Sequence, residues 1–104
     1  MKKVEAIIQS EVSKQVVRAI RKIGVEGVTL TQSLGQGEGE RPEIGGQQIE
    51  FNSTDVVMTV VPDSKVREVV AEIIRVSHTG EKSDGKIFVS NIEESYDIAT
   101  KEKS

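Results

Sequence analysis

The sequence predicts an α+β domain in which two β-α-β halves form one antiparallel sheet with its helices on a single face. Three observations support this prediction. Apolar residues alternate with polar ones along four segments, as in strands with one buried face. They recur every three to four residues along two other segments, as in amphipathic helices. The length of 104 residues suits one domain with a modest core.

Composition narrows the class of protein. Apolar residues make up 36% of the chain and charged residues 30%, with no tryptophan and one tyrosine. These values suit a globular domain with an aliphatic core. The net charge of −3 is spread along the chain and gives no sign of a nucleic-acid or membrane surface. The absence of cysteine excludes disulfides and thiolate metal sites.

The chain is expected to be cytoplasmic. No apolar run approaches the ~20 residues that a membrane-spanning helix needs. The first residues are charged too early for a signal peptide.

The first half predicts strand, helix, strand. Residues 2–9 alternate as a strand. Residues 11–23 follow with helical spacing, Ser10 serving as N-cap and Gly24 as the C-terminal cap. Residues 28–34 form the second strand.

A long loop is expected at about residues 36–52, because glycines and charges there carry no sustained period. Loops of this length inside a small domain are commonly functional. The alternative is a hairpin tip with no partner, on which the acidic residues are simply solvated.

The second half repeats the pattern. Residues 49–61 predict a strand with a kink or bulge at 52–55, residues 64–76 a helix capped by Asp63, and residues 86–92 a last strand. A short edge strand in the tail would pack Tyr96, and residues 100–104 would fray. With right-handed crossovers, these elements give the ferredoxin-like fold with strand order 4-1-3-2.

The sheet face away from the helices is expected to be apolar. Such a face is usually buried against another subunit, so an oligomer is expected. The residues expected there are Ile7, Thr29, Val56, Met58, Val60 and Phe88.

The turn at residues 79–86 is the strongest candidate site. Gly80 and Gly85 permit backbone angles that a Cβ would forbid. Consecutive amides in such a turn can bind an anion, and Lys86 adds a positive charge beside them. The alternative is an ordinary Asp-Gly turn.

Other chemistry is weakly supported. The glycines at 35, 37 and 39 are followed neither by the Lys-Ser/Thr of a phosphate-binding loop nor by a helix. His78 has no second histidine or cysteine with which to bind a metal. No nucleophile with an adjacent base, and no arginine-bearing phosphate cradle, can be assembled, so the protein is not expected to be an enzyme.

Four segments together resemble the PII signal-transduction proteins, with a correspondence that runs over nearly the whole chain. They are Lys2-Lys3-Val4-Glu5-Ala6-Ile7-Ile8, Gly24 to Thr31 leading to Gly35-x-Gly37, Val60-Val61-Pro62-Asp63, and Thr79-Gly80-x-x-x-Asp84-Gly85-Lys86-Ile87-Phe88-Val89.

The resemblance implies a homotrimer that binds adenine nucleotide between neighbouring subunits. A mobile T-loop would control a partner such as an ammonium transporter or a nitrogen-metabolism enzyme. The implied nucleotide-binding residues are Ile7, Thr29, Gly35, Gln36, Gly37, Val60, Ser83, Asp84, Gly85 and Lys86. The implied partner-binding residues of the loop are Glu38, Glu40, Arg41, Ile44 and Gln47.

Departures from the family pattern alter the expected ligand. Glu38-Gly39 replaces the usual Arg-Gln, whose glutamine helps to bind Mg²⁺ and 2-oxoglutarate, and Asp97 and Ala99 replace two phosphate-binding arginines. Each charge-assisted hydrogen bond to a phosphate contributes about 1.5–3 kcal/mol. We therefore expect ADP or AMP to be preferred over ATP, without tight binding of 2-oxoglutarate. The alternative is a divergent sensor of AMP, another nucleotide or bicarbonate.

Overall fold

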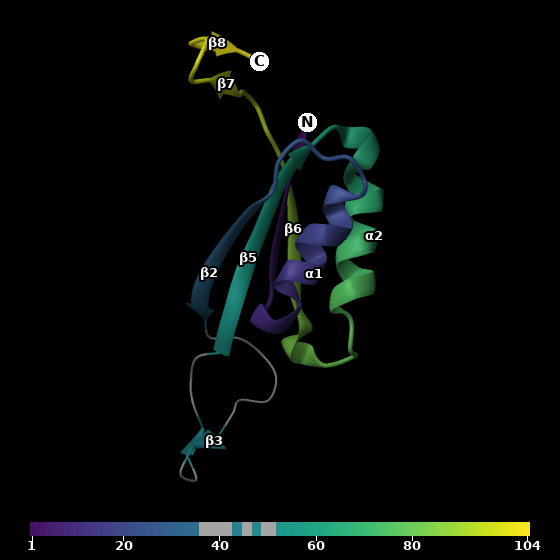
Figure 1. Ribbon diagram of the computed structural model, residues 1–104, viewed down its shortest axis with the longest axis vertical. Coiled ribbons are helices and arrows are strands. Elements are labelled where there is room, and N and C mark those ends of the chain that lie inside the picture. The colour runs from purple at the N-terminus through teal and green to yellow at the C-terminus, as the bar shows by residue number, and fades with distance from the viewer. Residues whose placement is uncertain (36–42, 45–46, 49–51) are drawn as a thin grey trace.

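A four-stranded antiparallel sheet carries both long helices on one face in the computed structural model, which describes residues 1–35, 43–44, 47–48 and 52–104 (Figure 1). The strands of this sheet are β1 (Lys2–Gln9), β2 (Thr29–Gly35), β5 (Asn52–Val61) and β6 (Gly85–Asn91), and the helices are α1 (Ser10–Arg21) and α2 (Val66–Ser77). The spatial order β2-β5-β1-β6 is the predicted one. The ferredoxin-like fold is thereby confirmed.

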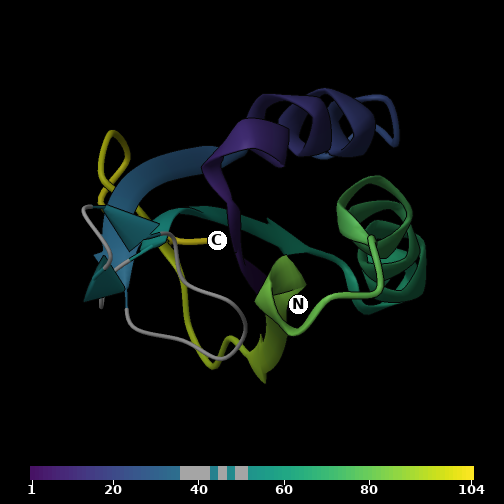
Figure 2. The same ribbon diagram turned by 90° about the horizontal axis from the view of Figure 1, so that it is seen from below.

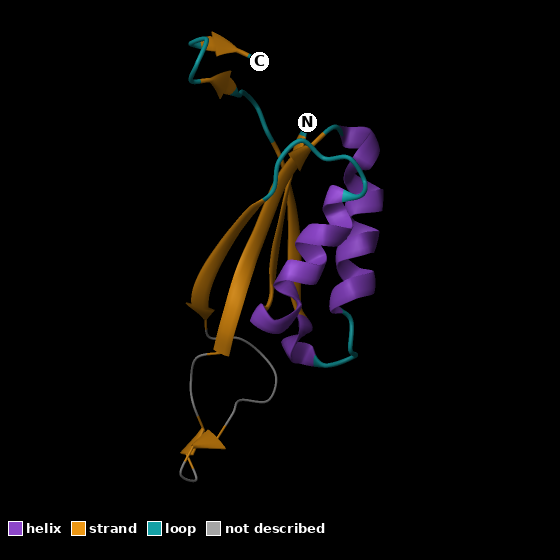
Figure 3. Ribbon diagram, in the orientation of Figure 1, coloured by secondary structure: helices purple, strands orange, loops and turns teal. Residues whose placement is uncertain are grey.

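Short elements complete the described chain (Figure 3). Single 3-10 turns are η1 (Asp63–Lys65) and η2 (Lys82–Asp84). Within the loop, β3 (Glu43–Ile44) pairs with β4 (Gln47–Gln48), a hairpin that the sequence pattern did not indicate. In the tail, β7 (Tyr96–Asp97) pairs with β8 (Glu102–Lys103).

The expected edge strand of the tail was wrong. Because β7 pairs with β8, the tail forms its own hairpin beyond one end of the sheet (Figure 1). Tyr96 is 60% exposed, and its hydroxyl donates to Glu94 at 2.7 Å instead of packing on the sheet. Lys101, in the turn of this hairpin, has a positive φ of 63°. Fraying of residues 100–104 stays a prediction.

The core lies between the sheet and the helices, and it is aliphatic as predicted. Alternate residues of β1 and β5 face residues spaced three or four apart on α1 and α2, and Figure 2 shows both helices on one side of the curved sheet. Each fully buried aliphatic side chain contributes about 1.5–3 kcal/mol. The buried cluster is Val4, Ala6, Ile8, Val16, Ile20, Val57, Val61, Val69 and Ile73.

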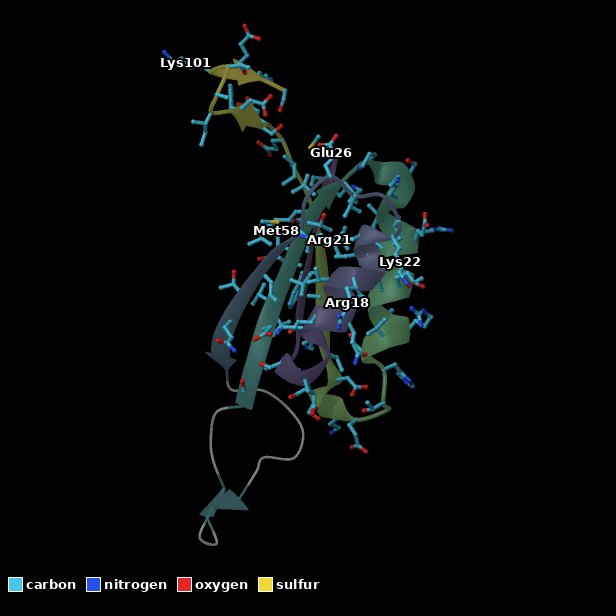
Figure 4. All side chains as sticks on the ribbon, viewed as in Figure 1. Arg18, Arg21, Lys22, Glu26, Met58 and Lys101 are labelled. Carbon is cyan, nitrogen blue, oxygen red and sulfur yellow. The ribbon has the colours of Figure 1, made fainter. Side chains whose placement is uncertain are left out.

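The opposite face of the sheet and the outer side of α1 meet solvent. Figure 4 shows Met58 on the sheet side away from the helices, and Arg18, Arg21 and Lys22 projecting from α1. None of the helices in the described part of the chain is long and apolar enough to cross a membrane.

Two predicted helix N-caps were wrong. Ser10 is the first residue of α1, and Gln9 occupies the N-cap position without a side-chain hydrogen bond. Asp63 begins η1 and accepts from the Met1 amino group at 2.8 Å, while Lys65 is the N-cap residue of α2. Both side chains bond groups distant in sequence, Ser10 by donating to Asp55 and Asp63 by accepting from Met1, instead of capping the adjacent helix. The predicted C-terminal cap was wrong too: Lys22 is the C-cap residue of α1, and Gly24, with φ of 93°, lies two residues beyond it.

The predicted kink at residues 52–55 was also wrong. Strand β5 pairs without interruption with β2 from Asn52 and with β1 from Thr54. Asp55 is buried, and its Oδ2 lies 2.5 Å from the Ser13 hydroxyl while its Oδ1 accepts from Ser10 at 3.0 Å. A buried carboxylate needs such donors, and the first turn of α1 supplies them.

Gly85 sits where β6 begins against β1. Its φ is 119°, and a Cβ built there would lie 1.9 Å from the carbonyl oxygen of Ile7. That oxygen belongs to the backbone of a central strand, so it cannot move aside cheaply. Glycine is therefore required at the junction of the candidate turn and the sheet.

Replacing Gly85 with alanine is expected to lower the free energy of unfolding by about 2 kcal/mol or more, through backbone strain and the clash with Ile7. Urea unfolding at a fixed protein concentration measures this. Gly27→Ala is the control, because nothing lies within 4 Å of the Cβ that it would add. Equal stability of the two variants would contradict the required close approach.

Ser13→Ala is expected to cost about 1.5–3 kcal/mol of unfolding free energy, since it removes a donor from the buried Asp55 carboxylate. The matched control is Ser64→Ala at an exposed position of η1, for which a change within ~0.5 kcal/mol is expected. Thermal and urea unfolding compare the variants. A cost at Ser13 no larger than at Ser64 would refute the stabilising role of this bond.

Candidate ligand-binding site

The turn between α2 and β6 is organised around the Asp84 carboxylate. Its Oδ2 accepts from the backbone N–H of Thr79 at 2.7 Å and of Gly80 at 3.0 Å, and its Oδ1 accepts from the Thr79 hydroxyl. The Thr79 hydroxyl bond, assisted by the two backbone N–H groups, lowers the pKa of Asp84 below its ordinary value of 3.8. The carboxylate therefore stays ionised and holds the turn closed near neutral pH.

The anion-binding concavity predicted from this stretch exists, but its anion is the chain's own Asp84. The amides of Thr79 and Gly80 point inward to that carboxylate. A bound ligand would therefore meet the outer surface of the turn and Lys86. Within the described turn, Asp84 holds the backbone at Thr79 and Gly80 in its closed conformation.

Lys86 and Ile7 lie opposite one another on adjacent strands of the open sheet face. Both are exposed, and none of the ion pairs found among the described residues involves Lys86. An exposed ammonium group next to an aliphatic side chain suits a ligand with an anionic part and an apolar part.

The other predicted residues in the described chain lie elsewhere on the sheet. Thr29 pairs with Met58, and Val60 pairs with Lys3. Val60 lies four residues along β5 from Val56, which is the partner of Ile7. That spacing corresponds to about 13 Å along the strand. Gly35 ends β2 at the same end of the sheet as the turn, but on the opposite edge. Three strand spacings, about 14 Å, separate those edges.

The predicted residues of one chain are therefore spread across the sheet: Ile7 and Val60 lie on the central strands β1 and β5, and the other placed residues lie at the two edges. The β6 edge carries the turn and Lys86, and the β2 edge carries Thr29 and Gly35. The tail hairpin with Asp97 lies beyond the end of the sheet opposite the turn (Figure 1).

Several predicted positions are not placed. Residues Gln36, Gly37, Glu38, Glu40 and Arg41 lie outside the described residues. Ile44 and Gln47 belong to β3 and β4, for which the backbone alone is described. The partner-binding role of these residues stays a prediction.

A cavity of about 400 Å³ lies behind the turn, on the helix side of the sheet. Half of its ten lining residues are aliphatic, and the others include His78, Asp84 and Lys86. The Ser77 hydroxyl in it is buried and has no hydrogen-bond partner within the described part of the chain. The aliphatic lining residues are Ile8, Val70, Ile73, Ile74 and Ile87.

Two residues that shape the site were missed from the sequence. Thr79 closes the turn on Asp84, and a hydroxyl five residues before an aspartate in a glycine turn could have indicated it. The Gln9 amide donates to the Ser83 carbonyl across 74 residues, which no local pattern reveals.

His78 is exposed at the end of α2, as expected. Among the residues that the structure describes, no cluster of acids and histidine could hold a metal ion.

Thr79→Val is expected to raise the pKa of Asp84 toward 3.8, because it removes the hydroxyl bond to the carboxylate. In the unaltered protein, the contribution of Asp84 to turn stability is present above its ordinary pKa and is lost as pH falls through the lowered folded-state value. A pH titration of the Asp84 carboxyl by NMR measures both values. Thr31→Val, at an exposed position of β2, should leave the Asp84 titration unchanged. An unshifted titration in the Thr79 variant would contradict this assignment.

Comparison with known proteins finds one matching family and several relatives that are similar over nearly their full length. Residues 1–102 match the family described as "Nitrogen regulatory protein P-II". A nitrogen regulatory protein P-II from Bradyrhizobium diazoefficiens is 37% identical over 106 residues, covering 98% of this chain and 95% of the relative. Its counterpart from Nostoc punctiforme is 39% identical over 108 residues, covering 100% of this chain and 96% of the relative. That from Azospirillum brasilense is 36% identical over 107 residues, covering 99% and 96%.

The match runs through the sheet, both helices and the Thr79–Lys86 turn, and it spans nearly the full length of each relative. The chain belongs to the P-II family of nitrogen regulatory proteins, which act as signal proteins rather than as enzymes.

Proposed function

We propose that this protein senses an adenine nucleotide at a site shared between neighbouring subunits and controls a partner protein through the loop at residues 36–52. The observation that carries the proposal is the division of the site. The turn with Lys86 and the strand end with Gly35 lie at one end of the sheet but on opposite edges.

A second copy can bring the two halves together. If the β2 edge of one subunit lies beside the β6 edge of the next, Thr29 and Gly35 of one chain approach Ile7 and Lys86 of the other. The open face supports such an assembly, because Ile7 is 40% and Phe88 52% exposed beside the half-buried Val56, Met58 and Val60. A face this apolar is expected to be covered. A homotrimer is the form that we propose.

The charges around the turn favour a ligand with few phosphates. Lys86 is the cation placed on the open face beside Ile7, and the tail presents Asp97 where the family pattern has an arginine. Fewer cations disfavour ATP, with its greater negative charge, more than ADP or AMP. We therefore propose ADP or AMP as the preferred ligand, without tight binding of Mg²⁺ or 2-oxoglutarate.

In this proposal the regulated partner is an ammonium transporter or an enzyme of nitrogen metabolism, contacted in the cytoplasm. The loop joins β2 to β5 at the same sheet end as the turn. A ligand at the turn is therefore placed at the base of the loop that would contact the partner.

The same scarcity of cations favours a second candidate function. The protein would then be a P-II-type sensor of another small anion, such as bicarbonate or a different nucleotide. Thermal-shift measurements across nucleotides, bicarbonate and 2-oxoglutarate distinguish the two, because only the true ligand raises the melting temperature by preferential binding to the folded state.

Lys86→Ala is expected to weaken ADP binding at least about tenfold, since it removes a charge-assisted hydrogen bond to phosphate. Isothermal titration measures the dissociation constants for ADP, AMP, ATP and 2-oxoglutarate. Lys14→Ala, at an exposed position of α1, is the control and should bind as the unaltered protein does.

Unchanged ADP binding by the Lys86 variant would refute this placement of the site. Sub-micromolar ATP binding that 2-oxoglutarate strengthens would refute the ligand preference while leaving the site in place.

A further inference from the structure

The end of β1 contacts both the candidate turn and the base of the loop. The side-chain amide of Gln9 donates to the carbonyl of Ser83 in the turn. The hydroxyl of the next residue, Ser10, lies 2.9 Å from the Ser53 hydroxyl and 3.0 Å from the Asp55 carboxylate. Two consecutive residues thus connect the turn to the first residues of β5.

The sheet order explains why this connection is possible. Strand β1 lies between β5 and β6. Its last residues therefore face the start of β5, where the loop ends, on one side and the start of β6, where the turn ends, on the other. Gln9 is opposite Thr54, and Ile8 is opposite Gly85.

The connection consists of side-chain hydrogen bonds, so it can change while the backbone pairing of the sheet persists. Gln9 and Ser10 are each partly exposed, and their bonds join segments 74 and 43 residues apart. Ser13 holds the far oxygen of Asp55 at 2.5 Å, which fixes the β5 end of the connection to α1. The turn end is fixed by the closed hydrogen-bonding of Asp84 with Thr79 and Gly80.

We propose that Gln9 is a positioning residue that couples ligand binding at the turn to the base of the loop, through Ser83 on one side and Ser10 with Ser53 and Asp55 on the other. This inference rests on the proposed function, in which the outer surface of the turn binds ADP. A ligand that draws the Ser83–Lys86 backbone toward itself changes the Ser83–Gln9 bond. That change reaches the loop base through Ser10, because Gln9 and Ser10 share one peptide unit at the start of α1. Two sites are coupled when both bias the same element in this way.

The test uses Gln9→Met, which keeps the length of the side chain and removes its donor. Gln15→Met, at an exposed position of α1, is the matched control. Amide hydrogen exchange of Ser53, Thr54 and Asp55 is measured with and without saturating ADP, and isothermal titration gives the ADP affinity of each variant.

In the unaltered protein and in Gln15→Met, ADP is expected to slow exchange at these three amides at least about fivefold. In Gln9→Met that protection is lost, although ADP still binds. Ser10→Ala breaks the other half of the connection and should lose the protection too, which keeps the test available if one variant unfolds. The double variant should lose no more than either single one, because the two residues act in series.

Full ADP-dependent protection in Gln9→Met or in Ser10→Ala would overturn the coupling role. So would additive losses in the double variant. If titration shows that the unaltered protein does not bind ADP, the proposed function fails and this inference fails with it. If ADP binds the unaltered protein without protecting residues 53–55, the coupling inference alone is refuted.

Discussion

The arrangement of the domain at the end that carries the loop depends on the hydrogen bonds of the buried Asp55 carboxylate. A carboxylate removed from water is costly unless it is hydrogen-bonded, so Ser13 and Ser10 must stay beside it. These bonds fix where α1 begins relative to β5, and hence where the loop returns to the sheet. On the other side of β1, the close approach of Gly85 to Ile7 fixes where β6 begins. The candidate turn is positioned by that second contact.

Most of the fold could be predicted from apolar periodicity, because burial of one face governs both strands and helices. Alternation along β1 and β5 and helical spacing on α1 and α2 identified the elements, and right-handed crossovers between them then gave the strand order. The failures share a cause. Ser10, Asp55 and Asp63 are polar residues whose partners lie far away in the sequence. Local rules assigned them to adjacent caps or kinks, but tertiary contacts decided their roles.

The candidate site could be predicted in part. The turn at Thr79–Lys86 was recognisable because glycines, an aspartate and a lysine follow one another closely. The sequence did not reveal what the backbone amides of the turn bind, since the same residues could leave the amides free for a ligand or close them on Asp84. The separation of Gly35 from Lys86 on opposite edges follows only from the sheet order.

The two edges of the sheet are formed by different strands, β2 and β6, and this limits the symmetry of any assembly that joins them. Within the described sheet, β2 and β6 each pair with one neighbour only. Contact between β2 of one copy and β6 of the next is heterologous, since each copy contributes a different surface. Such contacts satisfy every copy only when they close into a ring; otherwise they continue as a filament with two unmatched ends. With the ligand site shared as proposed, a closed ring of three would have as many complete sites as subunits, and an open chain of copies would have one fewer.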